Sequence, residues 1–150
     1  MRAVVQRVRS ASVLSDGVLT GAIEQGLVVL LGVERGDTME EMRWLASKVV
    51  GQRIFNDTDG KMNIDLAAVA GQLLVVSQFT LLASTRKGQR PSYVRSALPP
   101  EAEPLYEAFV RELARLSETK VATGRFGADM QLSLVNDGPV TIVLDTRLRE

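Results

Sequence analysis

The chain has 150 residues, of which 45% are hydrophobic and 24% charged, which predicts one folded domain spanning residues 1–150 and excludes a disordered protein. Its 18 basic side chains balance 18 acidic ones, so any attraction to a nucleic acid must come from local clusters of charge. Because the sequence contains neither histidine nor cysteine, it excludes Ser-His-Asp triads, thiol nucleophiles, disulfides and metal sites built on those side chains.

The first third of the chain predicts a β-meander. Valine-rich residues 3–14 form the first expected strand, and Asp16-Gly17 is a hairpin-type turn signal. Residues 18–23 return as a second strand, and residues 26–33 read as a buried third strand. This apolar run is far shorter than the ~20 residues of a membrane span, and the N-terminal residues do not resemble a signal peptide. We therefore expect a cytoplasmic protein without a membrane segment.

A first helix follows, with Thr38 as its expected N-cap. Its buried face is predicted from apolar residues at helical spacing, namely Met42, Leu45, Ala46 and Val49. Residues 56–60, Asn-Asp-Thr-Asp-Gly, invite comparison with a calcium-binding loop. With Gly60 at the sixth position of an EF-hand loop, however, Phe55 and Leu66 would occupy its first and last positions, and neither can ligate a cation through its side chain. A tight turn is the better interpretation.

The second half predicts a strand at residues 73–82, a polar and basic loop at 88–100 and an amphipathic helix at 101–117. Residues 131–135 and 140–144 then read as two strands around a sharp loop. Strands both precede and follow each helix. The sequence therefore predicts a single compact α/β domain, layered β/β/α, with a mixed sheet and two main helices.

Two polar segments interrupt or end apolar strands. The first, Ser77-Gln78-Phe79-Thr80-Leu81, could present backbone N–H groups, an amide and a hydroxyl to a ligand, or could be an ordinary strand with polar residues on its solvent face. The second, Asn136-Asp137-Gly138-Pro139-Val140-Thr141, contains a glycine and a proline that favour unusual backbone geometry, although a plain tight turn would also explain it.

A basic cluster lies between them in sequence. It consists of Arg86, Lys87, Arg90 and Arg95, and no acidic residue occurs between Ser84 and Pro100. Such a cluster suits phosphate groups. The alternative is a solvated loop whose charges are balanced by Glu101 and Glu103.

Together, the two segments resemble the two signature motifs of the D-aminoacyl-tRNA deacylase family. The resemblance also covers residues 1–8, 54–63 and 87–92 in family order, and thus nearly the whole chain. It implies hydrolysis of the ester between a D-amino acid, or glycine, and tRNA. It also implies that no cofactor or metal is needed, in agreement with the missing histidine and cysteine.

The resemblance further implies roles for individual residues. Catalysis would involve Gln78, Phe79 and Thr80, with backbone N–H groups near Phe79 and Thr80 polarising the ester carbonyl and the 2′-hydroxyl of the tRNA helping to activate water. A nucleophilic Thr80 is less favoured, because the chain offers no histidine to activate its hydroxyl. Substrate binding and chiral selection would involve Ser77, Leu81, Asn136, Gly138 and Pro139.

In the family, Gly138-Pro139 would form a cis peptide whose carbonyl oxygens exclude an L side chain, and Arg7 would hold this loop. The basic residues Arg86, Lys87 and Arg90 would bind tRNA. The resemblance also implies a homodimer with active sites at the subunit interface. Two alternatives remain at this point: a related tRNA-editing domain that removes a mischarged L-amino acid, and a non-catalytic RNA-binding module, which the neutral charge and 5% aromatic content support poorly.

Overall fold

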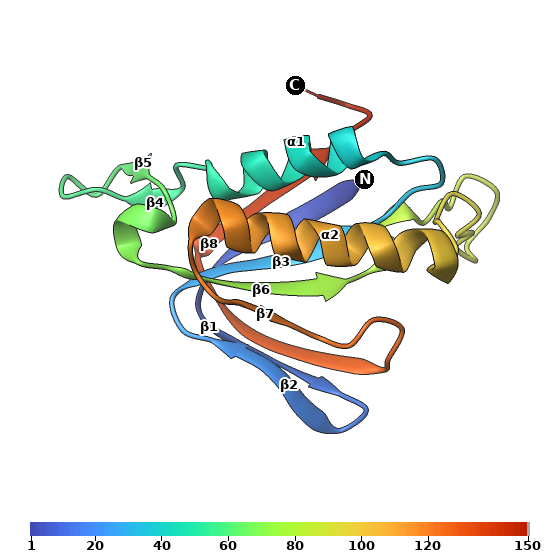
Figure 1. The fold of residues 1–150 in the computed structure, drawn as a ribbon, viewed down its shortest axis with the longest axis horizontal. Helices are drawn as coiled ribbons and strands as arrows, with labels where there is room; N and C mark the ends of the chain where they lie inside the picture. The colour runs from blue at the N-terminus through green and yellow to red at the C-terminus, as the bar shows by residue number, and fades with distance from the viewer. Residues whose placement is uncertain (150) are drawn as a thin grey trace.

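The computed structural model describes residues 1–149, and Figure 1 shows how its helices and strands are arranged. In chain order the elements are β1 (Arg2–Ser15), β2 (Val18–Ile23), β3 (Gly26–Gly32), α1 (Met39–Val50), β4 (Phe55–Asn56), β5 (Met62–Ile64), the 3-10 turn η1 (Ala67–Val69), β6 (Gln72–Ser77), the 3-10 turn η2 (Phe79–Leu82), α2 (Pro99–Ser117), β7 (Val121–Thr123) and β8 (Met130–Asp145). The mixed α/β architecture with two main helices is confirmed.

The long strand β1 organises the main sheet because both of its edges are paired. One edge pairs antiparallel with β8 along most of its length, and the other pairs with β3 through residues 2–8 and with β2 through residues 11–15. Beyond β3, the strands β6 and β7 continue as parallel neighbours, so the sheet is mixed. The sheet curls until β2 approaches β7: a Cβ added to Gly21 would lie 2.8 Å from the Thr123 carbonyl oxygen.

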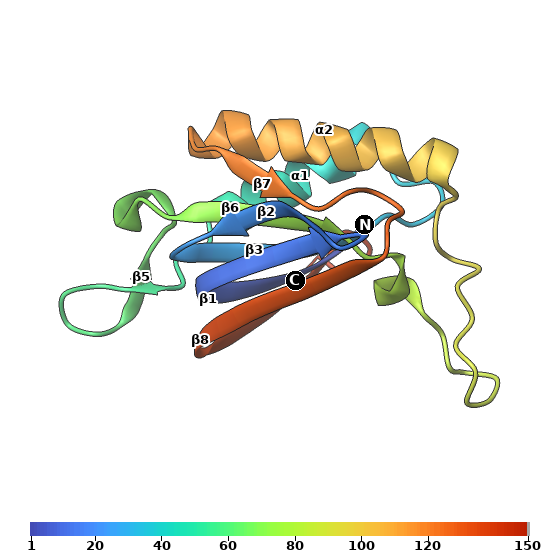
Figure 2. The same cartoon turned by 90° about the horizontal axis from the view of Figure 1, so that it is seen from below.

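Both long helices lie on the same face of the sheet, as Figure 2 shows, and they run side by side in Figure 1. Helix α1 begins with the expected cap, since the Thr38 hydroxyl accepts from the Glu41 N–H and the Glu41 carboxylate accepts from the Thr38 N–H. Its four predicted apolar positions are all buried. Helix α2 begins two residues earlier than predicted, because Pro99 suits the first helical turn, where an N–H has no intrahelical partner.

The curled sheet creates two hydrophobic cores. The larger lies between the sheet and the helices and includes the fully buried Leu45 and Phe109. The smaller lies on the other face, where Val13 of β1 and Val28 of β3 pack with Leu74 of β6. The two cores correspond to the expected layered arrangement. Neither α1 nor α2, the long helices in residues 1–149, is apolar enough to cross a membrane.

The predicted strand 73–82 is wrong beyond Ser77. Its partner β3 ends at Gly32, and Leu31 with Ser77 is the last pair between the two strands. Without a continuing partner, the chain turns into η2, where the Leu81 N–H donates to the Gln78 carbonyl oxygen at 3.3 Å. The polar motif 77–81 therefore forms a turn at the end of the strand.

The C-terminal prediction of two strands around a sharp loop is also wrong. Residues 130–145 form one strand, β8, which stays beside β1 throughout. Val8 of β1 pairs with Asn136 and Gln6 pairs with Thr141, so the residues between Asn136 and Thr141 form a bulge. Because β1 pairs with β8 on both sides of the bulge, residues 130–145 continue as one strand. Gly138 and Pro139 lie where the β1–β8 pairing is interrupted.

Candidate active site

A cavity of about 420 Å³ lies at the C-terminal ends of β3 and β6, beneath the first turns of α2. Its wall includes the first three residues of the polar motif, Ser77, Gln78 and Phe79, whereas Thr80 and Leu81 lie outside it. The lining is otherwise mainly apolar. The further lining residues are Leu31, Val33, Arg35, Tyr93, Ser96, Ala97, Leu98, Pro99, Ala102, Tyr106, Phe126, Gly127, Ala128 and Met130.

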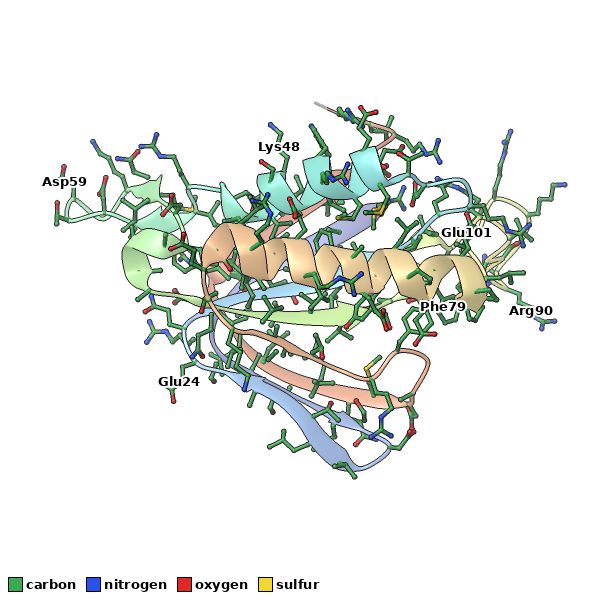
Figure 3. The ribbon with its side chains drawn as sticks, in the orientation of Figure 1. Glu24, Lys48, Asp59, Phe79, Arg90 and Glu101 are labelled. Carbon is green, nitrogen blue, oxygen red and sulfur yellow. The ribbon has the colours of Figure 1, made fainter. Side chains whose placement is uncertain are left out.

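Aromatic rings gather at this cavity. Phe79 and Tyr93 meet edge to face with ring centroids 5.1 Å apart, and Tyr106 lies 5.7 Å from Phe126. Phe79 is 56% exposed, which leaves most of its ring free to contact a ligand; Figure 3 shows it beside α2. This arrangement suits a flat, apolar ligand that stacks on aromatic faces.

The buried Tyr106 is a structural group in this wall. Its hydroxyl donates to the Val75 carbonyl oxygen at 3.1 Å and ties α2 to β6. Burial raises the pKa of Tyr106 to about 12, so the phenol stays protonated at neutral pH and does not act as a base. Among the lining residues, Arg35 is the one charged side chain, and its Nε donates to the Ser96 carbonyl oxygen at 3.2 Å.

The motif turn is held by contacts to its backbone. The Gln78 N–H donates to the Leu31 carbonyl oxygen at 2.7 Å, which continues the β3–β6 pairing by one bond. The Ser96 hydroxyl donates to the Phe79 carbonyl oxygen at 3.0 Å, and Ser96 is buried. Because the first N–H groups of a helical turn have no partner within it, those of Phe79 and Thr80 are free of intrahelical bonds.

The side chains of the motif offer little acid–base chemistry. The Gln78 amide donates to the Thr80 hydroxyl oxygen at 3.2 Å, so these two predicted catalytic residues contact each other. Thr80 is exposed, and an amide cannot accept its proton usefully. The geometry therefore supports a role for backbone donors more than a role for a threonine nucleophile.

The Gly138-Pro139 bulge is exposed and is held from beneath by Arg7. The buried Arg7 side chain donates to the Asp137 carbonyl oxygen at 3.1 Å and to the Ile54 carbonyl oxygen at 2.6 Å. The Asn136 amide oxygen accepts from the Val140 N–H at 3.0 Å and so spans the bulge. The peptide bond between Gly138 and Pro139 is cis.

Within one chain the two motifs lie at opposite ends of the sheet. The bulge is opposite residues 6–8 of β1, which pair with the beginning of β3 at residues 26–28. The cavity is lined by Leu31 and Val33, at and beyond the other end of β3. None of the cavity-lining residues comes from positions 136–141. One chain therefore does not bring Gly138-Pro139 to the Ser77-Gln78-Phe79 wall.

The predicted tRNA-binding residues lie on the loop between η2 and α2. Arg86, Lys87 and Arg90 are all exposed, and an antiparallel bridge between Ser84 and Ser92 closes the loop around them. Figure 3 shows Arg90 projecting outward at the same end of the molecule as Phe79. Arg95 differs from these three, because its Nε donates to the Glu34 carboxylate at 2.9 Å and is already neutralised there.

Several residues of the site were not predicted from the sequence. Tyr93, Ser96, Tyr106 and Phe126 line the cavity, and Asn56 contacts Arg7 through its amide oxygen. The one signal available was the placement of aromatic residues. The sequence has only two tyrosines and four phenylalanines, and both tyrosines with two of the phenylalanines meet here.

Known proteins resemble this chain over its whole length. The family model described as "D-Tyr-tRNA(Tyr) deacylase" matches residues 4–145. A protein of Akkermansia muciniphila named "D-aminoacyl-tRNA deacylase" is 59% identical over 150 residues, which cover 100% of both chains. One of Dehalococcoides mccartyi with the same name is 56% identical and covers 99% of this chain and 97% of its own length.

Solved structures share the fold. The structure of the "c-Myc DNA Unwinding Element Binding Protein" has a TM-score of 0.90 and 38% identity, covering 97% of this chain and 98% of that one. A "probable eukaryotic D-amino acid tRNA deacylase" has a TM-score of 0.82 over 95% of this chain and 97% of its own, with 16% identity, and supports the fold alone. With a family match over 142 consecutive positions, from 4 to 145, and full-length relatives above half identity, the chain belongs to the D-Tyr-tRNA(Tyr) deacylase family of hydrolases.

Proposed function

We propose that this chain hydrolyses the ester bond of D-aminoacyl-tRNA, and of glycyl-tRNA mischarged on a non-cognate tRNA, and releases the free amino acid and tRNA. The observation that carries the proposal is the aromatic cavity bounded by Ser77, Gln78 and Phe79. Its volume of about 420 Å³ lies in the range of small-ligand sites. Its stacking surfaces suit the terminal adenosine to which every tRNA attaches its amino acid.

The reaction proceeds through positioned backbone groups and water. With the adenosine in the cavity, the ester lies beside the turn that begins at Phe79. The N–H groups of Phe79 and Thr80 polarise the ester carbonyl and stabilise the developing oxyanion. The 2′-hydroxyl of the tRNA helps to activate the attacking water. Gln78 orients the start of the turn through its backbone N–H, which donates to the Leu31 carbonyl oxygen.

Chirality is checked by exclusion of the L enantiomer. The carbonyl oxygens of Gly138 and Pro139 occupy the space that an L side chain would need, whereas a D side chain or a hydrogen points elsewhere. This mechanism accepts a broad range of D-amino acids because it does not grip the side chain. Asn136 supports it by fixing the Val140 N–H across the bulge, and Arg7 supports it from beneath.

The complete site needs a second copy of the chain, since one chain keeps the two motifs apart. In the proposed homodimer, the exposed Gly138-Pro139 bulge of one subunit reaches the cavity of the other. In residues 1–149, β8 pairs only with β1, and it exposes Val135 and Val143 by 52% and 63%. An unpaired, apolar edge of this kind is an aggregation hazard unless a partner covers it. A two-fold interface covers both copies at once.

The remaining parts of the proposal concern the tRNA and the compartment. Arg86, Lys87 and Arg90 contact the phosphate backbone of the tRNA, because they are exposed and Arg90 projects at the same end of the molecule as Phe79 (Figure 3). The protein acts in the cytoplasm, where aminoacyl-tRNA is used. No cofactor is required, because water, the tRNA hydroxyl and backbone donors supply every group that the reaction needs.

The decisive assay compares matched D- and L-tyrosyl-tRNA with purified protein. Rapid release of D-tyrosine with the L ester left intact is the expected result. Equal hydrolysis of both would refute the exclusion mechanism, preferential hydrolysis of an L ester would indicate an editing domain of opposite selectivity, and binding without turnover would indicate an RNA-binding module. In a second assay, a Gly138→Ala chain and a Phe79→Ala chain are mixed after dissociation. The heterodimer is expected to regain one intact composite site.

A further inference from the structure

Three strands present a row of adjacent residues beside the motif turn. Arg2 lies on β1 between its two partners, Gly32 of β3 and Asp145 of β8. Directly opposed residues on neighbouring strands point to the same face of a sheet. Arg2, Asp145 and the space above Gly32 therefore lie together on the face that η2 covers.

The Arg2 guanidinium joins Asp145 to the motif turn. Its Nε and Nη2 donate to Asp145 Oδ2 at 2.9 and 2.7 Å, and its Nη1 donates to the Leu81 carbonyl oxygen at 2.7 Å. The contact with Leu81 joins residues 79 positions apart in the chain. Because the Asp145 side chain is 9% exposed and that of Arg2 is 25% exposed, both groups are largely shielded from water. A planar guanidinium with two hydrogen bonds to one carboxylate has a fixed orientation. The third donor, Nη1, therefore points in a fixed direction toward the Leu81 carbonyl oxygen.

Gly32 leaves the room that the turn occupies. A Cβ at this position would lie 3.1 Å from the Gln78 carbonyl oxygen and 3.3 Å from the Leu81 Cβ. The turn consequently rests on the backbone of β3, while Arg2 reaches it from the neighbouring strand. Ser96 holds the Phe79 carbonyl oxygen from the other side. The position of the turn is thus defined by contacts at both of its ends.

We propose that Arg2 is a positioning residue for the reaction, which holds the Leu81 carbonyl and thereby sets the orientation of the Phe79 and Thr80 N–H groups. Asp145 holds Arg2 in the required rotamer. An ion pair that served stability alone would need only the two bonds to Asp145, whereas the third bond fixes one end of the motif. Donors to a developing oxyanion must be placed within about half an ångström to be effective. The inference rests on the proposed catalytic role of this turn.

The test separates positioning from stability with two variants. Arg2→Met removes all three donors but leaves the largely shielded Asp145 carboxylate without the Arg2 cation, which destabilises the fold. Arg2→Met combined with Asp145→Leu removes the whole pair and relieves that penalty. Arg115→Met is the matched control, because Arg115 makes a similar two-bond pair with Glu112 on the exposed face of α2. For each protein, thermal unfolding, kcat, KM for D-tyrosyl-tRNA and the amide resonances of residues 78–82 are measured.

We expect the double variant to recover thermal stability while its kcat stays about ten- to a hundredfold below that of the starting protein, with KM changed by less than about threefold. The amide resonances of the turn shift in both Arg2 variants and not in the control. Recovery of kcat together with stability, or unmoved turn resonances, would overturn the inference. Shifted resonances with unchanged kcat would overturn it as well, and would also show that the proposed catalytic role of the turn is wrong. If Arg2→Met does not fold, the double variant alone decides.

Discussion

Replacing Gly138 by alanine tests whether the geometry of the β8 bulge controls the reaction. Gly138 has a φ of +125°, which L side chains rarely adopt. An added Cβ would lie 2.8 Å from Val140 Cγ2, 3.0 Å from Arg7 Nη2 and 3.1 Å from the Val140 nitrogen. Arg7 cannot simply move away, because the same guanidinium donates to the Ile54 carbonyl oxygen.

The structure also gives the expected size of the effect. The backbone conformation costs about 1–3 kcal/mol for a residue other than glycine. Displacing Val140 from its preferred rotamer adds about 0.5–1.5 kcal/mol. The sum of roughly 1.5–4.5 kcal/mol is smaller than the usual 5–15 kcal/mol of total stability, so the variant remains folded. Gly60→Ala is the control, since Gly60 has a φ of +76° but nothing within 4 Å of the added Cβ; it is expected to lose about 1–2 kcal/mol.

Two assays measure the outcome. Urea unfolding is expected to shift its midpoint by about 1–2 M for Gly138→Ala, and less for Gly60→Ala, at an unchanged slope. Hydrolysis of D-tyrosyl-tRNA is expected to slow at least about tenfold in Gly138→Ala, and the preference for D over L to fall, because the carbonyl oxygens of the bulge move. If Gly138→Ala matched Gly60→Ala in stability and kept both rate and enantiomer preference, the reasoning on this bulge would be refuted.

Three further outcomes are expected. Thr80→Ala retains most of the hydrolytic rate in single-turnover assays, because the backbone N–H at this position is unchanged; a covalent acyl adduct on Thr80 in mass spectrometry would contradict this. Burial raises the pKa of Asp145, but hydrogen bonds from the Arg147 N–H and from Arg2, with the charge of Arg2, outweigh it and lower the pKa below the ordinary value. The ionised Asp145 carboxylate therefore contributes fully to the free energy of unfolding above the ordinary aspartate pKa of about 3.9, and this contribution is lost as the pH falls through the lower pKa of the folded state. Stability measured by acid unfolding is therefore expected to depend less steeply on pH in Asp145→Asn. Charge reversal of the exposed loop cations, Arg86, Lys87 and Arg90, is expected to weaken tRNA binding and to reduce its dependence on salt concentration. Charge reversal of Arg111 and Arg115 on α2 is the control and is expected to change neither.

Short sequence patterns correctly predicted the turns and helix faces that depend on interactions between residues close together in the chain. The Asp16-Gly17 turn and the α1 face followed from turn chemistry and helical spacing, and the structure has positive φ angles at both turn residues and all four α1 positions buried. The end of β6 could not be predicted in this way. Residues 73–82 were predicted to continue as one strand, but the pairing with β3 ends at Ser77 and that with β7 ends at Val75.

The C-terminal strand shows the same limit. Asn136-Asp137-Gly138-Pro139 has the composition of a tight turn, and turn chemistry by itself cannot distinguish a hairpin from a bulge. The choice is made by β1, which is long enough to pair with residues on both sides of the bulge, from Met130 to Asp145. This pairing joins residues more than a hundred positions apart, so no short stretch of the sequence indicates it. The motif was visible in the sequence, but its position relative to the cavity was not.

The overall composition also gave no indication that the aromatic residues gather at one place in the fold. An aromatic content of 5% gave poor support to a non-catalytic RNA-binding module, yet Phe79, Tyr93, Tyr106 and Phe126 meet at one cavity. Stacking depends on the local density of rings at the site and not on their average over the chain. The four rings come from η2, the loop before α2, α2 itself and the loop after β7, so only the fold assembles them.

In the proposed mechanism, backbone groups take the place that catalytic side chains occupy in many other hydrolases. Substituting an exposed motif side chain such as Thr80 then leaves the reacting groups intact, because the N–H survives every substitution except proline. The sensitive positions are instead those that fix the backbone. Gly32 permits the turn to rest on β3, Arg2 holds its far end, and Arg7 holds the bulge that carries Gly138. Mutational effects on the rate are therefore expected to follow contacts to the backbone of the two motifs, even where the substituted side chain never reaches the substrate.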